Sequence, residues 1–185
     1  MSNSAFATLT KLAAQTRKST SGLPESTSAA PRWSGIGFSL MGYKFVVPMG
    51  QISELMNVPP VTTLPGVQPW VTGLANVRGR LLPLFDLAVF FGGALTLQKK
   101  QHRVLVLESD TLYSGLVIDQ SHGMQHFDST ERRSEIPSSL PENLSPLVAG
   151  SFQGDGDDTW VVFDFHKLAV DSRFVNAALV YPLTV

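Results

Sequence analysis

Residues 64–87, LPGVQPWVTGLANVRGRLLPLFDL, are the stretch of sequence from which the fold can be argued. Two prolines near its start fix φ and bracket a turn. After them, Trp70, Val71 and Leu74 have the i, i+1, i+4 spacing of one helical turn that faces a core. Gly73 lies between them and permits close packing. The first half of the stretch therefore predicts a short helical turn on a buried surface.

The second half of the same stretch predicts a break followed by a strand. Residues 76–79 (NVRG) interrupt the apolar pattern, and Gly79 can take a positive φ there. Residues 80–87 form an apolar strand that Pro83 interrupts, and a proline in a sheet belongs at an edge or a bulge. Asp86 stands near the end of this strand, where its carboxylate can cap neighbouring backbone N–H groups.

Outward from this stretch, the pattern is that of a mainly β protein. Residues 36–49 alternate apolar and other residues around Gly42, which predicts a hairpin. A short helix is expected near 165–178, and residues 126–147, rich in Pro, Ser and Glu, form the longest predicted loop. Many short strands separated by Gly and Pro favour small barrels over a parallel βαβ sheet. The remaining predicted strands are 80–87, 103–108, 112–119 and 159–164.

The N-terminal part of the chain differs from the rest. Residues 5–18 place four apolar residues at helical spacing, which predicts a short amphipathic helix. Residues 19–31 have almost no apolar bulk and are typical of a flexible linker. We therefore divide the chain into an extension (1–34), a main domain (35–172) and a C-terminal segment (173–185).

The composition excludes several classes of function. The chain has 185 residues, no cysteine, 16% charged residues and a net charge of −1. Without cysteine there is no disulfide framework, no thiolate nucleophile and no cysteine-based zinc site. The near-neutral charge gives no electrostatic attraction to nucleic acid or anionic lipid. No apolar run approaches the roughly 18–20 residues of a membrane span, and no signal peptide is expected.

The histidines and the acidic cluster do not form a catalytic or metal-binding constellation. His122 and His126 are four residues apart, but we interpret their surroundings as a loop, and they lack the HExxH pattern. Asp155, Asp157 and Asp158 resemble a calcium loop only faintly, whereas Asp-Gly is typical of a hairpin tip. We therefore expect no enzyme, no cofactor and no metal site.

The stretch at 64–87 resembles the signature of CheW-like domains. In that family a short helix leads into Asn-hydrophobic-Arg-Gly, followed by a strand that ends hydrophobic-Pro-hydrophobic-hydrophobic-Asp-Leu. Residues 36–55, 115–119 and 160–168 resemble further parts of the family pattern, so that the resemblance covers about 35–172. It implies two small five-stranded SH3-like β-barrels packed together, with short helices. The matching signature residues are Asn76, Val77, Arg78, Gly79, Pro83, Leu84, Phe85, Asp86 and Leu87.

The resemblance also implies a function. Such proteins are non-catalytic adaptors that join the regulatory domain of a CheA-type histidine kinase to the cytoplasmic tip of a methyl-accepting chemoreceptor. They are cytoplasmic and are recruited to membrane-bound receptor arrays. The phrases at 33–38, 64–83, 103–108 and 123–127 resemble most the family members that serve type IV pili and twitching motility, whose receptor is PilJ-like. No nucleic acid and no membrane insertion are expected.

The family pattern suggests roles for individual residues. It places Arg78 and Val117 toward the receptor and Ile52 and Glu54 toward the kinase, although the surface near Glu54 is less charged than is typical of the family. Two interpretations of Arg78 stay open: a receptor-facing groove, or a turn held through backbone carbonyls or the nearby aspartate. Val117 also fits a core position, and residues 52–54 also fit an ordinary strand edge. The residues interpreted as backbone requirements or caps are Gly73, Asn76, Gly79, Pro83 and Asp86.

Two other functions remain open at this stage. A CheW-like module could compete with a coupling protein instead of coupling. A small-barrel protein could bind single-stranded nucleic acid, which requires a basic stripe with interleaved aromatic residues. Lys99, Lys100 and Arg103 are the only comparable cluster outside 131–133.

Overall fold

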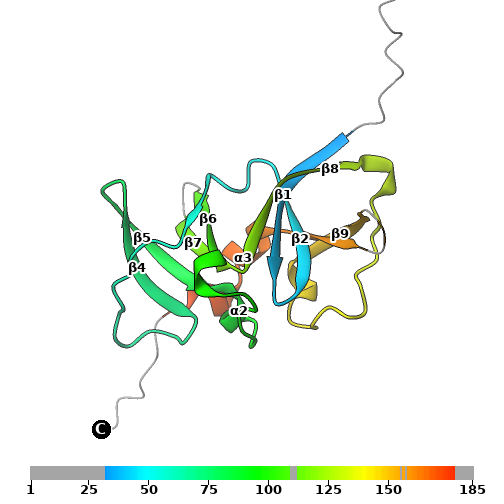
Figure 1. The fold of residues 1–185 in the computed structure, drawn as a ribbon. Helices are drawn as coiled ribbons and strands as arrows, with labels where there is room; N and C mark the ends of the chain where they lie inside the picture. Colours follow the sequence, from blue (N-terminus) through cyan, green and yellow to red (C-terminus); the bar gives the residue numbers. More distant parts are fainter. Residues whose placement is uncertain (1–31, 109–111, 155, 157, 178–185) are drawn as a thin grey trace, which may run out of the picture. The chain divides into compact units, whose positions relative to one another are not determined.

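The computed structural model describes residues 32–108, 112–154, 156 and 158–177. The helix expected at 5–18 and the linker at 19–31 lie outside these ranges. Within them the chain is mainly β, as predicted, with short helices (Figure 1). The strands are β1 (Arg32–Leu40), β2 (Tyr43–Pro48), β3 (Glu54–Asn57), β4 (Val71–Val77), β5 (Arg80–Asp86), β6 (Arg103–Glu108), β7 (Tyr113–Ile118), β8 (Gln120–Asp128), β9 (Val148–Gln153) and β10 (Thr159–Phe163). The helical segments are α2 (Leu87–Phe90), α3 (Phe165–Ala169) and α4 (Ser172–Val175), with 3-10 turns η1 (Lys99–Gln101), η2 (Ser129–Glu131) and η3 (Ser145–Leu147).

The strands form two five-stranded sheets, which confirms the predicted fold class. The first sheet has the order β8-β1-β2-β10-β9, and the second has the order β3-β6-β7-β5-β4. Figure 1 shows the two sheets side by side, with α3 between them. Each sheet contains an antiparallel hairpin whose second strand also pairs in parallel with a later strand. In the first sheet the hairpin is β1–β2 and β2 pairs with β10; in the second the hairpin is β4–β5 and β5 pairs with β7. The chain thus builds the same arrangement twice, although the sequence shows no visible repeat.

Both hairpins close with a two-residue turn of the same kind. Met41-Gly42 joins β1 to β2, and Arg78-Gly79 joins β4 to β5. The four φ angles are positive, at 54°, 83°, 52° and 81° in chain order. Positive φ at both central positions is the pattern of a type I′ turn, whose twist matches that of the flanking strands. For Met41 and Arg78 this conformation costs about 1 kcal/mol, which strand pairing on either side offsets.

The central strands are apolar on both faces because each face packs on a different core. In β6, Val104 and Val106 pack inside the second sheet, whereas Leu105 and Leu107 pack on a core that both sheets share. β2, β7 and β10 alternate in the same way between the shared core and the interior of their own sheet. A strand buried on both faces has a continuous apolar sequence, which explains the run VLVL at 104–107.

A buried carboxylate ties the two sheets together. Asp119 has no exposed surface and lies between β7 of the second sheet and β8 of the first. Its Oδ2 accepts from the backbone N–H of Met41 (2.8 Å), and its Oδ1 accepts from the N–H groups of Thr96 (2.5 Å) and Leu97 (3.1 Å). Its own N–H donates to the carbonyl of Ser39 (3.1 Å). These charge-assisted bonds compensate the carboxylate for the loss of water and hold the segment before β6 against the first sheet.

The helical turn predicted at 70–74 is wrong, because most of it belongs to strand β4. The pairing of β4 with β5 shifts register between Val71 and Gly73, and this bulge gives the strand an apolar spacing that resembles a helix. Gly73 has a φ of 138°, and a side chain there would collide with the carbonyl of Thr62, whose residue forms a β-bridge with Leu74. The expected close packing at Gly73 is therefore present, on a strand.

Other parts of the chain differ from the prediction in extent. The stretch around His122 and His126 is strand β8 and not a loop, so the long loop begins only after residue 128. Strand β9, absent from the prediction, pairs with β10 as a hairpin across 154–158. The helix expected near 165–178 is two short helices, α3 and α4, because Asp171 caps the start of α4.

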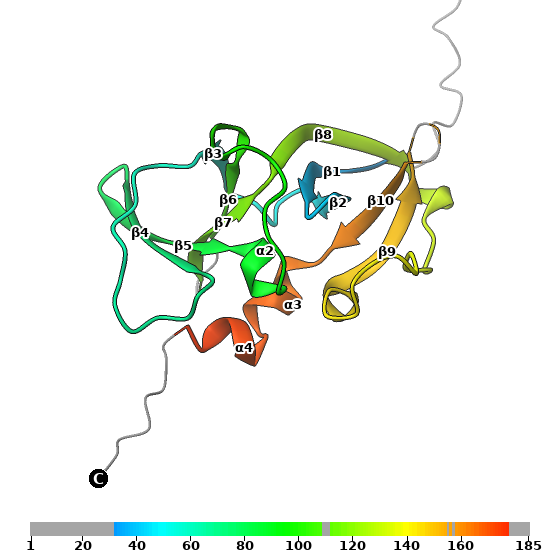
Figure 2. The same cartoon turned by 60° about the horizontal axis from the view of Figure 1, so that its bottom comes forward.

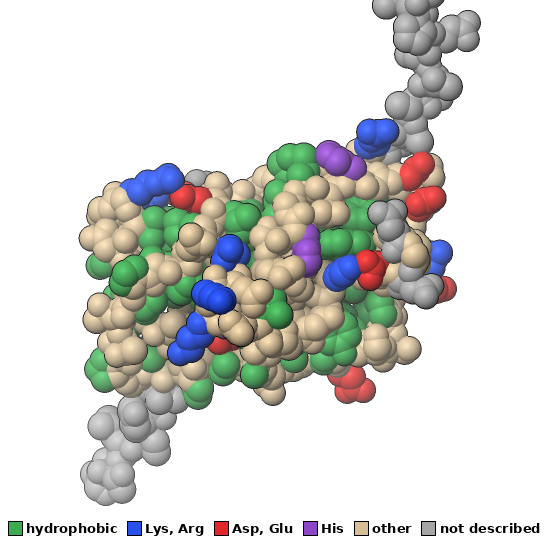
Figure 3. Space-filling view, viewed as in Figure 1, with side chains coloured by type: hydrophobic (Ala, Val, Ile, Leu, Met, Phe, Trp, Pro, Cys, Tyr) green, Lys and Arg blue, Asp and Glu red, His purple; other side chains and the backbone are tan. Residues whose placement is uncertain are grey.

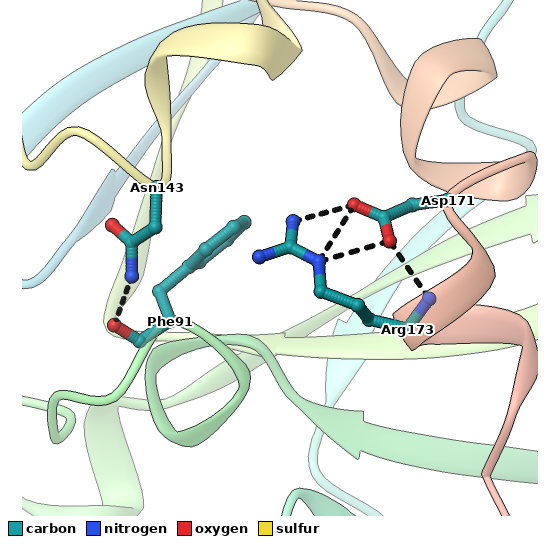
Figure 4. Close-up of polar contacts among 4 residues, drawn as sticks. All are labelled: Phe91, Asn143, Asp171 and Arg173. Atoms are coloured by element: carbon teal, nitrogen blue, oxygen red, sulfur yellow. Dashed lines mark hydrogen bonds and ion pairs between the residues drawn. The ribbon is translucent and has the colours of Figure 1, made fainter.

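Helix α2 is the place where the C-terminal helices and the long loop meet the second sheet. Phe174 of α4 contacts Phe90 of α2, with ring centroids 5.4 Å apart, and Figure 2 shows the two helices near each other. Asn143 of the loop donates through Nδ2 to the carbonyl of Phe91 (2.6 Å). Figure 4 shows this bond together with the contacts between the Asp171 side chain and Arg173. Segments distant in sequence thus converge on one short helix.

We predict that Asp119→Asn lowers the free energy of unfolding by about 2–3 kcal/mol, since an amide nitrogen would face backbone N–H donors in a buried site. A denaturant melt measures this change. Asp158→Asn is the matched control: its ion pair with Lys44 is partly open to solvent, in contrast to the fully buried Asp119, so the loss should be about 1 kcal/mol or less. Equal losses for the two variants would contradict the structural role of Asp119.

Candidate protein-interaction surfaces

Arg78 lies at the tip of the β4–β5 hairpin, and its side chain points across the sheet. The turn is held by Asn76, whose Oδ1 accepts from the N–H of Gly79 (2.9 Å). The guanidinium of Arg78 donates through Nη2 to Oε1 of Glu54 in β3 (2.7 Å). The Arg78 side chain is 79% exposed and that of Glu54 is 28% exposed. The arginine thus presents most of its surface to solvent while one edge is ion-paired.

This geometry corrects one of the two interpretations of Arg78. A structural Arg78 was expected to bond backbone carbonyls or Asp86, whereas its partner is Glu54. Asp86 instead accepts from the N–H of Val89 (3.0 Å) and caps α2, the kind of contact expected of this carboxylate. The structure therefore joins two residues that the family pattern assigns to different partners. Local sequence could not show this, because 24 positions separate them.

A second ion pair follows the first along the same end of the second sheet. Arg80 of β5 donates to Glu108 of β6 (2.7 Å), and its guanidinium stacks 3.9 Å from the ring centroid of Tyr113. Leu81, the next residue, is 66% exposed, and Leu55 of β3 is 41% exposed. We call this group the hairpin-end surface: Glu54, Leu55, Arg78, Arg80, Leu81 and Glu108. Neither leucine could be identified as exposed from the sequence, because the face of the sheet on which a strand residue lies is known only once the register of the strand is known.

Glu54 is the first residue of the edge strand β3, and Ile52 precedes the strand by two residues. Ile52 is half-buried and packs on the shared core. The backbone between them is fixed because Ser53 donates from its N–H (2.9 Å) and its Oγ (3.1 Å) to the carbonyl of Val106. Glu54 and Leu55 are neighbours in this strand and therefore point to opposite faces: Glu54 meets Arg78, and Leu55 is exposed to solvent.

Val117 is buried, with 5% of its surface exposed, so it is not a freely exposed contact. It reaches solvent only as part of the lining of a hollow of about 600 Å³ on the second sheet. Val58 and Leu95 contribute further apolar lining, and Thr72 and Asp86 line the hollow from β4 and β5. The structure therefore separates Val117 from the hairpin tip that carries Arg78, because the hollow includes the end of β5 that is remote from that tip.

Pro83 lies inside the second sheet, opposite Leu74 of β4. The pairing of β5 with β7 begins one residue later, at Leu84. Because Pro83 has no pairing partner in β7, its missing N–H breaks no hydrogen bond on that side. β5 is an inner strand of the sheet, so the proline does not lie on an edge strand.

His122, on β8, is half-buried between polar and aromatic neighbours. Its Nε2 lies 3.1 Å from Oγ of Ser39, and its ring meets that of Trp160 edge-on at 5.4 Å. Burial, followed by the nearby Lys44 ammonium, lowers the pKa of His122 below its usual value, and Asp158 acts in the opposite direction. In the part of the chain that the structure describes, no three His, Cys, Asp or Glu residues are grouped to hold a metal ion, and no helix is long and apolar enough to cross a membrane.

The chain matches known proteins along most of its length. A family model described as CheW-like domain matches residues 34–173. Protein PilI of Pseudomonas aeruginosa is 41% identical over 174 residues, which cover 94% of this chain and 96% of that protein. The chemotaxis protein CheW of Helicobacter pylori is 28% identical over 108 residues, which cover 58% of this chain and 65% of that protein. The crystal structure of scaffolding protein TtCheW from Thermoanaerobacter tengcongensis has the same fold, with a TM-score of 0.65 at 21% identity over 77% of this chain and 96% of that one.

We predict that Arg78→Ala changes the free energy of unfolding by about 1 kcal/mol or less, because exposed ion pairs contribute little. Arg78→Asn should be about 1 kcal/mol more stable than the alanine variant, since asparagine tolerates the positive φ of this turn. Urea unfolding of both variants measures the difference. A loss of more than about 2 kcal/mol in both would make the guanidinium a structural group.

His122 should make the protein less stable in mild acid. Its pKa in the folded protein lies below the ordinary histidine value of 6.5, so the unfolded chain binds protons first as the pH falls. The resulting loss is absent well above pH 6.5 and grows as the pH falls through the interval between the unfolded and folded pKa values. Thermal melts between about pH 7 and about pH 5 should therefore show a smaller decrease for His122→Gln than for the wild type. A pH profile of His122→Gln identical to that of the wild type would refute the assignment.

Proposed function

The chain belongs to the CheW-like domain family, and we propose that it is a non-catalytic adaptor that joins a chemoreceptor to a CheA-type histidine kinase. The identity to PilI extends over nearly the whole chain. This supports placing the adaptor in a chemosensory system that controls type IV pili and twitching motility, with a PilJ-like receptor. Such an adaptor acts in the cytoplasm and is recruited to membrane-bound receptor arrays.

The observation that carries the proposal is the hairpin-end surface. Two ion pairs cross from the β4–β5 hairpin to β3 and β6, and two of the strands that carry them also display an exposed leucine, Leu55 on β3 and Leu81 on β5. Apolar side chains bordered by arginine and carboxylate groups have the composition of a protein-binding surface. The ion pairs also orient these charged side chains in the free protein, which lowers the side-chain entropy that binding has to remove.

We assign the kinase regulatory domain to β3, through Ile52, Glu54 and Leu55. β3 ends the second sheet, so one side of its backbone is not part of a ladder. A strand edge of this kind is suited to another β-rich domain, because it offers backbone hydrogen bonds in addition to side chains. The half-buried Ile52 supports the start of the strand, Leu55 faces outward, and Glu54 is turned toward Arg78.

We assign the receptor to Arg78 and to the hollow lined by Val117. Arg78 keeps most of its surface available although it is paired with Glu54. That pair places the receptor-facing and kinase-facing surfaces in direct contact at the hairpin tip. An adaptor with this arrangement would bring its two partners side by side on one sheet.

The proposal is tested by reconstituting the histidine kinase with membranes that contain the receptor and measuring kinase phosphorylation with and without the protein. Coupling predicts that phosphorylation rises only when receptor and adaptor are both present. A protein that competes with a coupling protein would instead lower phosphorylation in a mixture that already contains one. No effect in either assay would contradict a role in this signalling step.

Leu55→Asp should reduce the activation by at least about tenfold, because it places a charge at the centre of the kinase-facing strand. Val175→Asp is the matched control, since Val175 is 64% exposed and lies on α4, outside both proposed surfaces. Equal activation by the two variants would show that β3 does not face the kinase.

A further inference from the structure

The hollow beside Val117 combines an apolar lining with a cationic rim. Val58, Leu95 and Val117 supply the apolar surface. Lys99 and Lys100, from the turn η1, also belong to the lining. A volume of about 600 Å³ accommodates one or two large side chains of a partner. The chemistry therefore suits an apolar group that has negative charge close to it.

The segment that carries the two lysines is held in place by its own hydrogen bonds. Asp119 binds the N–H groups of residues 96 and 97, as described above. His102 bonds through Nε2 to the carbonyl of Leu97 (2.8 Å). Arg103 donates through Nη1 to the carbonyls of residues 100, 101 and 102, at 3.1, 2.9 and 2.8 Å. The rim is thus formed in the free protein, and Arg103 is a structural part of it.

The two lysines have no partner among the residues that the structure describes, in contrast to the other lysines there. Lys44 pairs with Asp158, and Lys167 donates to the carbonyl of Val148. None of the four ion pairs of the described ranges involves Lys99 or Lys100. Figure 3 shows a group of Lys and Arg side chains over the region of α2.

The acidic residue of the hollow does not neutralise this rim. Asp86 lines the hollow, but its Oδ1 accepts from the N–H of Val89 and caps α2. The lining also contains His102, whose ring bonds to a backbone carbonyl. Two lysines against one carboxylate leave the hollow with an excess of positive charge, whereas the chain as a whole has a net charge of −1.

We propose that this hollow binds an acidic and apolar segment of the receptor tip, in which an apolar side chain enters the hollow and flanking carboxylates meet Lys99 and Lys100. The inference rests on the proposed function and specifies the receptor chemistry that it requires. A helical segment has its backbone hydrogen bonds satisfied internally, so a receptor tip that presents a helix would offer only side chains. A hollow with an apolar lining and a fixed cationic rim is complementary to such a helix face, whereas the edge of β3 is suited to a strand.

The experiment measures the affinity of the full chain for a soluble cytoplasmic fragment of the receptor and, separately, for the kinase regulatory domain. Lys99→Glu combined with Lys100→Glu should weaken receptor binding by about tenfold or more and reduce its dependence on salt. Kinase binding should stay unchanged. The matched control is Arg132→Glu combined with Arg133→Glu, which reverses two adjacent exposed charges elsewhere and alters the net charge equally. Val58→Asp should weaken receptor binding from the apolar side of the hollow.

Each other outcome has a defined meaning. If the wild type binds both partners and the lysine variant binds the receptor equally well, the hollow is not the receptor site, while the adaptor function stands. If the lysine variant loses the kinase instead, the hollow serves the other partner and the inference is wrong. If the wild type binds no receptor, the proposed function fails together with the inference. Displacement of the receptor fragment by a single-stranded oligonucleotide, together with direct oligonucleotide binding at Lys99 and Lys100, would also overturn it.

Discussion

The rest of the structure depends on the buried carboxylate of Asp119. Each sheet encloses its own apolar cluster, but their relative placement requires contacts that neither sheet makes alone. Asp119 supplies them, because its two oxygens bond to the β1–β2 turn on one side and to residues 96 and 97 on the other. The shared core provides most of the apolar burial, which is non-directional. The carboxylate adds direction, and it also anchors the segment that carries Lys99 and Lys100.

This arrangement explains how a small protein without catalytic groups can hold two partners. Apart from Arg78, which touches Glu54, the receptor-facing hollow and the kinase-facing start of β3 lie at the two ends of the pairing between β3 and β6: Glu54 is opposite Val106, and Asn57, which precedes Val58 of the hollow, is opposite Arg103. At about 3.4 Å per residue, three residues of strand separate the two surfaces by about 10 Å. The shared core behind β6 makes this spacing rigid. A partner at one end would therefore be positioned relative to a partner at the other end without any change in the adaptor.

Much of the fold could be predicted from the sequence because the strands carry local signals. Glycines at the turns, alternation along 36–49 and the apolar runs at 103–108 and 159–164 located strands correctly. The failures have physical causes: a bulge at Gly73 gave a strand the spacing of a helix, and the polar strand β8 looked like a loop. The proposed roles depended on the family pattern alone. The Arg78–Glu54 pair, the exposure of Leu55 and the rim of the hollow arise from tertiary contacts, which local sequence does not encode.

The central claim is that one molecule carries receptor and kinase at the same time. The most direct measurement is analytical ultracentrifugation of the receptor fragment and the kinase regulatory domain, with and without this protein. Simultaneous binding predicts a ternary complex that contains all three proteins and that is absent when the adaptor is left out. Two binary complexes that exclude each other, with no ternary species at saturating concentrations, would contradict the account and identify the protein as a competitor.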